Sequence, residues 1–179
     1  MSGARERFEE SHTGLGVELG NCVSLCSLRA GPGLFGIDTR KIREVLGATT
    51  PQQVPLAPTY ISGVVPYRGE VLTTISLRAL LGLQQLPGAH CVLVLEDEEN
   101  EERFGLLVDS VGGVVAMGLN ALEVNPSALD PRSMALFDGT YRMPTELMVR
   151  LDPRRLRPSG LAESGLFAAP NREFKGEKI

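Results

Sequence analysis

Residues of the types that perform acid–base or nucleophilic chemistry are few and dispersed in this sequence. His12 lies in a polar stretch near the start, and His90 begins an apolar run. Ser110 follows Asp109, but a serine, a histidine and an aspartate can be drawn from almost any chain. No Gly-x-Ser-x-Gly turn, which exposes a nucleophilic serine, accompanies them. We therefore predict no catalytic residues.

Metal and phosphate sites are also poorly supported. Asp97, Glu99 and Glu101 alternate in the acidic run EDEENEE (96–102) as calcium ligands can, but the run lacks the central glycine and closing bidentate acid of an EF-hand. GLGVELG (14–20) has the glycines of a phosphate-binding loop, yet no strand precedes it and no helix clearly follows. We predict no metal and no cofactor, and interpret the acidic run as a solvated hairpin tip.

Three cysteines and two histidines are too few and too scattered for the usual zinc patterns. Cys22 and Cys26 lie four apart in an alternating run, so as strand residues they share a face. We interpret them as small buried apolar groups rather than a disulfide or redox pair. The odd cysteine count, without a signal peptide, predicts a cytoplasmic protein.

The composition predicts a globular chain and excludes two kinds of partner. The 179 residues are 42% apolar, enough for a core that needs neither disulfides nor a metal. Eighteen Lys and Arg against 22 Asp and Glu give a net charge of -4, which counts against nucleic acid, since its backbone is bound by clustered cations. No apolar run approaches the roughly 20 residues of a membrane span, so we predict no direct membrane insertion.

Short β-rich runs joined by turns are the commonest pattern along the chain. Four hairpins are predicted, from residues 22–28 with 34–37, 60–65 with 70–77, 90–96 with 103–111, and two runs within 136–151. Both ends of the chain mix charge with glycine and serine and lack a sustained period. We predict tails at 1–18 and 159–179 around one domain at 19–158.

Three short helices are predicted, each of about two turns, at residues 38–47, 76–82 and 152–158. In the first, Ile42 and Val45 fall on one helical face. Ser76 and Asp152 are placed to cap the other two, and Pro158 is expected to prevent extension of the last. Helices this short need packing to be stable. The fold is therefore predicted to be mainly β.

A weak internal repeat organises these elements. Phe-Gly-Ile at 35–37 recurs as Phe-Gly-Leu at 104–106, 69 residues later, and the strand capped by Ser76 has a counterpart at Asp152, 76 residues later. We predict two related, intertwined β-barrel subdomains of about 70 residues, dividing near 80–90. Four or five short antiparallel strands in each match a small closed barrel, which has no exposed sheet edge.

Charged groups near turns are the candidates for interaction. Arg68-Gly69 forms the tip of an apolar hairpin. The arginine is either a plain turn residue or an interaction residue that pairs with a carboxylate such as Glu44 or one on a partner. Five arginines and two acids lie between Arg142 and Arg157. That stretch is either the outer face of a hairpin and helix or a docking surface for an acidic partner.

The order of four motifs resembles the CheW family, the coupling proteins of bacterial chemotaxis-type signalling. The similar segments are FGIDTRKIREVLG (35–47), VPLAPTYISGVVPYRGEVLTTISLRALLGL (54–83), FGLLVDSVGGVV (104–115) and MVRLDPRRL (148–156). The resemblance runs from about Gly20 to Arg157. It implies two SH3-like five-stranded antiparallel barrels packed on each other, in agreement with the repeat and the hairpins.

The resemblance also implies a function and site residues. Family members are not enzymes; they bridge the regulatory domain of a CheA-type histidine kinase and the cytoplasmic hairpin tip of methyl-accepting receptors, and are recruited to membrane receptor arrays. Receptor-contact positions are matched by Ile42, Arg68 and Val114. Kinase-side positions are matched by Ile37, Glu44 and Val45, and Glu44 with Arg68 matches a charged pair. Structural turn and hairpin positions are matched by Gly63, Gly69, Gly105 and Asp109.

Departures from the family pattern leave alternatives open. Pro66-Tyr67 stands where the family usually has Asn-Leu, and because proline lacks a ladder donor we expect a sheet edge there and a reshaped receptor-facing hairpin. Ser76 replaces the family aspartate and keeps a helix cap. One alternative is a divergent member that binds a single partner and modulates a non-flagellar chemosensory pathway. The other is a small hydrolase or metal enzyme of unrelated fold.

Overall fold

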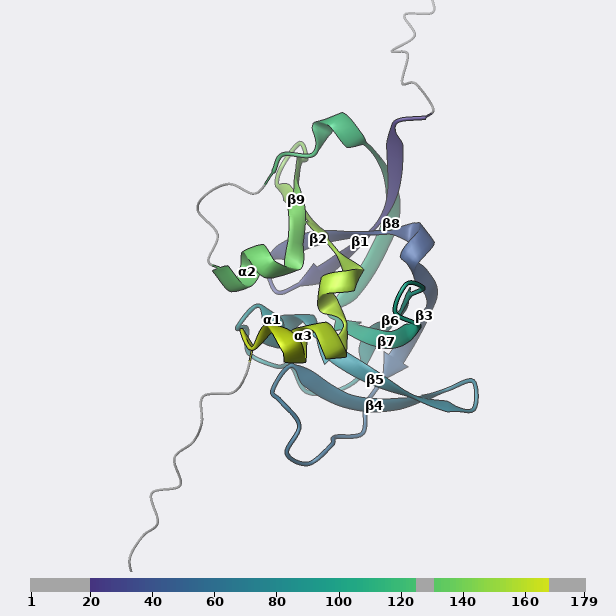
Figure 1. Cartoon of the computed structure of the whole chain (residues 1–179). Helices are drawn as coiled ribbons and strands as arrows, with labels where there is room; N and C mark the ends of the chain where they lie inside the picture. The colour runs from purple at the N-terminus through teal and green to yellow at the C-terminus, as the bar shows by residue number, and fades with distance from the viewer. Residues whose placement is uncertain (1–19, 125–130, 168–179) are drawn as a thin grey trace, which may run out of the picture.

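The computed structural model describes residues 20–124 and 131–167, and β-strands dominate this part of the chain (Figure 1). One five-stranded sheet, here called half-barrel A, has the order β8 (Ser110–Gly118), β1 (Cys22–Ala30), β2 (Gly33–Asp38), β10 (Leu147–Leu151) and β9 (Phe137–Arg142). The other, half-barrel B, has the order β3 (Ile42–Thr49), β6 (His90–Asp97), β7 (Glu102–Val108), β5 (Glu70–Ser76) and β4 (Ile61–Tyr67). The short helices are η1 (Thr39–Lys41), α1 (Leu77–Leu80), η2 (Leu119–Ala121), α2 (Pro131–Leu136), η3 (Pro153–Leu156) and α3 (Pro158–Ser164). The predicted mainly β fold of two five-stranded subdomains is confirmed.

Most neighbouring strands are antiparallel, as predicted, but each sheet contains one parallel pair. β2 runs parallel to β10 in half-barrel A, and β5 runs parallel to β7 in half-barrel B. The sheets are therefore mixed. The four predicted hairpins are confirmed as β1–β2, β4–β5, β6–β7 and β9–β10.

The internal repeat is visible in the fold, but its two copies exchange strands. β1 to β5 form the first copy and β6 to β10 the second. In each copy the first two strands lie in one half-barrel and the last three in the other. Gly36 in β2 and Gly105 in β7 are equivalent, because each lies in the central strand of its sheet opposite a parallel strand. Each half-barrel therefore contains strands of both copies, because the chain crosses between the sheets after the second strand of each copy. The divide near 80–90 separates the sequence copies, not the sheets.

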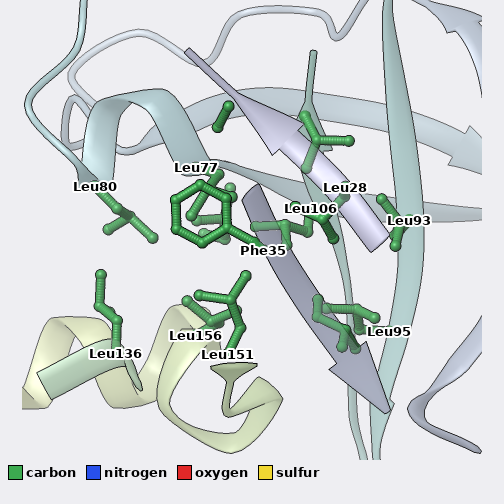
Figure 2. Packing of buried hydrophobic residues seen from close by; sticks show 14 of the residues in the cluster. Leu28, Phe35, Leu77, Leu80, Leu93, Leu95, Leu106, Leu136, Leu151 and Leu156 are labelled. Carbon is green, nitrogen blue, oxygen red and sulfur yellow. The ribbon is translucent and has the colours of Figure 1, made fainter. Parts of the chain in front are cut away.

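The largest hydrophobic core lies between the two half-barrels (Figure 2). It combines buried side chains of the central strands, such as Leu28, Phe35 and Leu95, with leucines of the short helices, such as Leu80 and Leu156. Each half-barrel also encloses a smaller core of its own. Because the central strands are covered on both faces, they read as nearly continuous apolar runs.

Residues 38–47 do not form the predicted helix. Asp38 caps only a single turn, η1, by accepting a hydrogen bond from the backbone N–H of Arg40 at 3.0 Å. From Ile42 onward, half-buried and exposed residues alternate, which is the period of a strand. The helix prediction is wrong because β3 pairs with β6, far away in the sequence, and this pairing overrides a weak helical spacing.

The other two predicted helix caps are confirmed. The Ser76 hydroxyl accepts a hydrogen bond from the backbone N–H of Ala79 at 3.1 Å where α1 begins. The Asp152 carboxylate accepts one from the backbone N–H of Arg154 at 3.0 Å where η3 begins. Both caps follow the last strand of a repeat copy, so each repeat ends in the same local structure.

The fold continues beyond its predicted end. The helix capped by Asp152, η3, ends at Leu156 before Pro158, as predicted. Pro158 then begins a further helix, α3, because a first-turn proline is tolerated. Leu161 is only 2% exposed, and the Phe167 ring packs edge-on against Tyr60 with ring centres 6.4 Å apart. The predicted tail from residue 159 is therefore wrong as far as Phe167. The remainder of both predicted tails lies outside the described residues.

Candidate interaction surface

The tip of the β4–β5 hairpin is a two-residue turn. Tyr67 pairs with Glu70, which leaves only Arg68 and Gly69 in the loop. Arg68 has φ 50° and Gly69 has φ 82°, so both lie in the left-handed region that a type I′ turn requires. Arginine seldom adopts this conformation, so the turn holds Arg68 at an energetic cost. Its side chain is 71% exposed.

Glu44 on β3 accepts two hydrogen bonds from this hairpin. Arg68 Nη2 donates to Glu44 Oε2 at 3.0 Å, and the Tyr67 hydroxyl donates to the same oxygen at 2.9 Å. The Arg68 guanidinium lies 5.2 Å from the centre of the Tyr67 ring, within the range of a cation–π contact. Burial raises the pKa of Tyr67, and the hydrogen bond to Glu44 raises it further, so the phenol remains a donor at neutral pH. The Glu44–Arg68 pair is thus present, with Tyr67 as a third member.

A second charged cluster, centred on Glu96, adjoins this pair. Arg43 and Arg103 donate to the two different carboxylate oxygens of Glu96, Arg103 at 2.9 Å. Arg43 also donates to Glu98 at 2.7 Å. Burial opposes ionisation of Glu96, but the hydrogen bonds from Arg103 and Arg43 outweigh it and lower the pKa of this carboxyl group. Because the Arg103 guanidinium lies 6.0 Å from the centre of the Tyr67 ring, Tyr67 joins the two clusters.

β3 and β8 are edge strands of half-barrels B and A, and they carry a bulge at equivalent positions. The bulge in β3 contains Arg43 and Glu44, whereas the bulge in β8 contains Gly112 and Gly113. Bulges reorient side chains at sheet edges. The two edges therefore share a backbone geometry but differ in chemistry, with charged side chains on β3 and bare backbone on β8.

Val45 and Val114 directly follow these bulges, and both are exposed, by 44% and 65% respectively. Their side chains are therefore accessible, as the predicted kinase contact of Val45 and receptor contact of Val114 require. The strands β3 and β8 and the tip of the β4–β5 hairpin lie on the side of the molecule away from α1, α2 and α3 (Figure 1).

The other two predicted contact residues are less accessible. Ile42 is half-buried and packs against the main core. Ile37 is 0% exposed in β2, between β1 and β10. The expectation that the Ile37 side chain is open to a partner is therefore wrong, because the half-barrel interior covers one face of this strand and the opposite sheet covers the other.

Three of the predicted turn and hairpin residues are glycines with structural reasons for being so. A Cβ atom on Gly63, where φ is 140°, would lie 2.2 Å from the backbone oxygen of Gln52. A Cβ on Gly105 would lie 2.7 Å from the side chain of Val92. Gly69 supplies the left-handed second position of the hairpin turn. Gly63 and Gly105 allow close packing of buried backbone, and Gly69 allows the turn, so their roles are structural.

Asp109 has a structural partner instead of a catalytic one. It accepts hydrogen bonds from Arg78 Nη1 at 2.5 Å and from the Gly31 backbone N–H at 2.7 Å, which ties α1 to the β1–β2 turn. His90 Nε2 contacts the backbone oxygen of Leu86 at 2.9 Å. Asp109 and His90 thus bond to structural partners and not to each other, and His12 lies outside the described residues.

The arginines between residues 142 and 157 all pair with acids of the same chain. The pairs are Arg142–Glu123, Arg150–Asp138, Arg155–Asp138, Arg154–Asp152 and Arg157–Asp97. This arrangement favours the outer-face interpretation of the stretch over a docking surface. Asp97 is buried beside Arg157 Nε at 3.1 Å, so only residues 98–101 of the acidic run form the exposed tip that was predicted.

Within residues 20–124 and 131–167, no group of three or more His, Cys, Asp or Glu side chains is arranged to hold a metal ion. In the same ranges, no helix combines the length and the apolar content needed to cross a membrane.

Arg43, Tyr67 and Arg103, which complete the charged surface, are absent from the sequence-based site prediction. The alternation of residues 42–49 could have identified a strand with Arg43 on its exposed face, but the prediction for these residues is a helix.

The CheW-like domain family model matches residues 24–159, about three-quarters of the chain. The chain belongs to the CheW-like domain family. CheW-like proteins are scaffolds of chemotaxis signalling and not enzymes. The match covers all ten strands except the first two residues of β1, so the family assignment applies to both half-barrels. The alternative of a hydrolase or metal enzyme of unrelated fold is thereby excluded.

Relatives of the CheW-like chain support the same assignment. Chemotaxis protein CheW of Treponema pallidum is 23% identical over 140 residues, covering 74% of this chain and 80% of the relative. Probable chemotaxis protein CheW of Rhizobium etli is 31% identical over 103 residues, covering 57% of this chain and 66% of the relative. The scaffolding protein TtCheW from Thermoanaerobacter tengcongensis superposes with a TM-score of 0.64 at 20% identity, covering 73% of this chain and 88% of that chain. The fold is therefore that of CheW, with two SH3-like subdomains.

Proposed function

We propose that this protein couples methyl-accepting chemoreceptors to a CheA-type histidine kinase, and that it binds the receptor hairpin tip and the kinase regulatory domain through two different, adjoining sets of residues. The receptor side includes Ile42, Arg68 and Val114, and the kinase side includes Glu44 and Val45. Holding both partners on one body raises their effective concentration and links their states. The scaffold acts in the cytoplasm, at arrays of membrane receptors.

The observation that carries this proposal is the Glu44–Arg68 pair on an exposed, conformationally fixed turn. Tyr67 donates a hydrogen bond to Glu44, and its ring lies within cation–π range of the Arg68 guanidinium. These contacts hold the hairpin tip in one shape before a partner binds. A preformed surface loses little conformational entropy on binding. The adjacent exposed Val45 adds apolar area of the kind that an interface buries.

A member that binds only one partner is the second candidate, and the hairpin gives a reason to test it. Pro66 lies on β4, an edge strand, as its missing N–H requires, and it is exposed. Tyr67 turns inward to Glu44. Together they give the tip a different surface from the Asn-Leu that is usual in the family. In a single-partner member, receptor binding is therefore the interaction we expect to be lost.

Titration of the protein separately with a receptor cytoplasmic hairpin fragment and with a kinase regulatory domain tests both candidates. Calorimetry is expected to show binding to each fragment, and to both at once. Binding to the kinase domain alone supports the single-partner candidate. Binding to neither overturns the proposed function.

Arg68→Glu and Arg142→Glu form a matched pair for this experiment. Both arginines are on β-hairpins, have similar exposure of 71% and 74%, and pair with one glutamate at 3.0 Å and 3.5 Å. Arg68→Glu is expected to weaken receptor binding at least about tenfold, because it places like charges together at the proposed contact. Arg142→Glu is expected to leave binding unchanged. Equal effects of the two variants would contradict the assignment of the hairpin.

A further inference from the structure

A polar hollow adjoins the hairpin on the outer surface of half-barrel B. Its lining consists of Arg43, Tyr67, Arg68, Glu96 and Arg103. Three guanidinium groups and one carboxylate form this lining, and Glu44, Glu98 and Glu70, which lie outside the lining, pair with Arg68, Arg43 and Arg103 respectively. The hollow itself therefore presents mainly N–H donors.

The guanidinium groups in the hollow are held in place before anything binds. Glu96 fixes Arg43 and Arg103 through its two separate oxygens. The Tyr67 ring lies within cation–π range of both Arg68 and Arg103. Arginine side chains normally lose considerable conformational freedom on binding, so this fixation lowers the entropic cost.

The same groups keep donor capacity for an incoming anion. Each guanidinium has five N–H donors. Arg68 contacts an acid through Nη2, and Arg43 through Nε and Nη2. Within residues 20–124 and 131–167, no hydrogen bond or ion pair engages Arg43 Nη1, Arg68 Nε or Arg68 Nη1. An arginine fork that is open on one side suits a carboxylate, which accepts two parallel hydrogen bonds.

Half-barrel A shows that the fold does not require this cluster. The strand pairings make Arg103 of β7 equivalent to Leu34 of β2, and Glu96 of β6 equivalent to Arg29 of β1. The bulge that carries Arg43 in β3 carries glycine in β8. Half-barrel A therefore forms without these three arginines. Folding alone does not explain why half-barrel B has them, which favours a role in binding.

We propose that this hollow is a carboxylate-binding subsite, which receives an aspartate or glutamate side chain from the receptor hairpin docked against Arg68. This inference rests on the proposed function, and adds that Arg43 together with Arg68 binds an acidic residue of the receptor, while Arg103 positions Glu96. The incoming carboxylate bonds to the open nitrogens of Arg43 and Arg68, while Glu96 keeps Arg43 and Arg103 oriented. Tyr67 acts as a positioning residue beneath the arginines.

Calorimetric titration with the receptor hairpin fragment at several sodium chloride concentrations tests the subsite. Arg43→Gln and Arg103→Gln are expected to weaken binding about tenfold each and to flatten its salt dependence. Each variant leaves Glu96 with one arginine, so the fold is expected to persist, and thermal unfolding of each variant checks this. Arg142→Gln, on half-barrel A, is the control and is expected to bind with the affinity and salt dependence of the unsubstituted chain.

The outcomes separate the subsite from the proposed function. If Arg68→Glu abolishes receptor binding while Arg43→Gln and Arg103→Gln bind with unchanged affinity and salt slope, the subsite is overturned and the coupling function stands. If the unsubstituted chain does not bind the fragment, both are overturned. Each acid of the receptor fragment is then neutralised in turn and tested with and without Arg43→Gln. For one acid, the loss of binding free energy in the double variant is expected to be smaller than the sum of the two single losses. Full additivity for every acid would overturn the subsite.

Discussion

Val45 and Val114 occupy equivalent positions on β3 and β8, which are edge strands of the two half-barrels. Val45 pairs with Leu93 of β6, and Val114 pairs with Cys26 of β1, each one residue after a bulge. Both remain exposed, so the repeat presents one apolar side chain from each half-barrel at the same point of the fold. The surroundings differ, because the β3 bulge is charged and the β8 bulge is glycine.

This equivalence provides a matched pair of variants, Val45→Asp and Val114→Asp. Both are expected to leave thermal unfolding nearly unchanged, within about 0.5 kcal/mol, because the sites are exposed. Under the proposed function, Val45→Asp weakens binding of the kinase domain only and Val114→Asp weakens binding of the receptor fragment only. Loss of the same partner in both variants would refute the division of the surface.

Ile37→Asp is expected to unfold the protein instead of removing a kinase contact. The side chain is fully buried in a central strand, and an unpaired carboxylate there costs more than about 4 kcal/mol. Urea unfolding measures the effect, with the exposed Val45→Asp as the control. A folded Ile37→Asp variant of normal stability would show that β2 is open to solvent on one face.

Gly63→Ala is expected to destabilise the fold by about 2 kcal/mol or more. The added Cβ meets the Gln52 backbone oxygen, and the φ of 140° is unfavourable for alanine. Gly113→Ala is the control, because nothing lies within 4 Å of its Cβ position and its φ is not in the restricted region. The urea denaturation midpoint is expected to be lower for Gly63→Ala than for Gly113→Ala. Similar midpoints would contradict the steric role of Gly63.

Leu161→Ala is expected to cost about 2–5 kcal/mol, because α3 buries this side chain in the main core. Leu166→Ala, at a 39% exposed position in the same segment, is expected to cost less than about 1 kcal/mol. Guanidinium unfolding curves distinguish the two. If both substitutions were neutral, residues 159–167 would be a tail after all.

Asp38→Asn is expected to lower the free energy of unfolding at neutral pH, and to lower it less at acidic pH. Hydrogen bonds from the Arg40 side chain lower the pKa of Asp38 despite the opposing effect of burial. A carboxyl group whose pKa is lower in the folded state stabilises it above the unfolded pKa, and the contribution disappears as pH falls through the folded pKa. Thermal unfolding from pH 7 downward is expected to show the difference between variant and unsubstituted chain shrinking. A constant difference would assign the effect to packing.

The sequence by itself determined the features that depend on neighbours in the chain. Alternating apolar runs with turn residues between them predict the four hairpins, and Ser76 and Asp152 predict the two helix caps, because these signals act over a few residues. The order of four motifs was enough to indicate the family. The chemistry of arginine made Glu44 one candidate partner of Arg68, and the resemblance implied the pair.

The tertiary structure decided everything that depends on pairing between distant segments. Residues 42–49 become a strand because β6 supplies their hydrogen-bond partners, and the two repeat copies exchange strands because β3 and β8 each cross to the other sheet. Ile37 is buried by layers on both faces of β2, which no local pattern records. Tyr67 meets Arg103 and Glu44 only after all five strands of half-barrel B have assembled. Side-chain proximity across a sheet follows from register, and register is fixed by burial of the whole core.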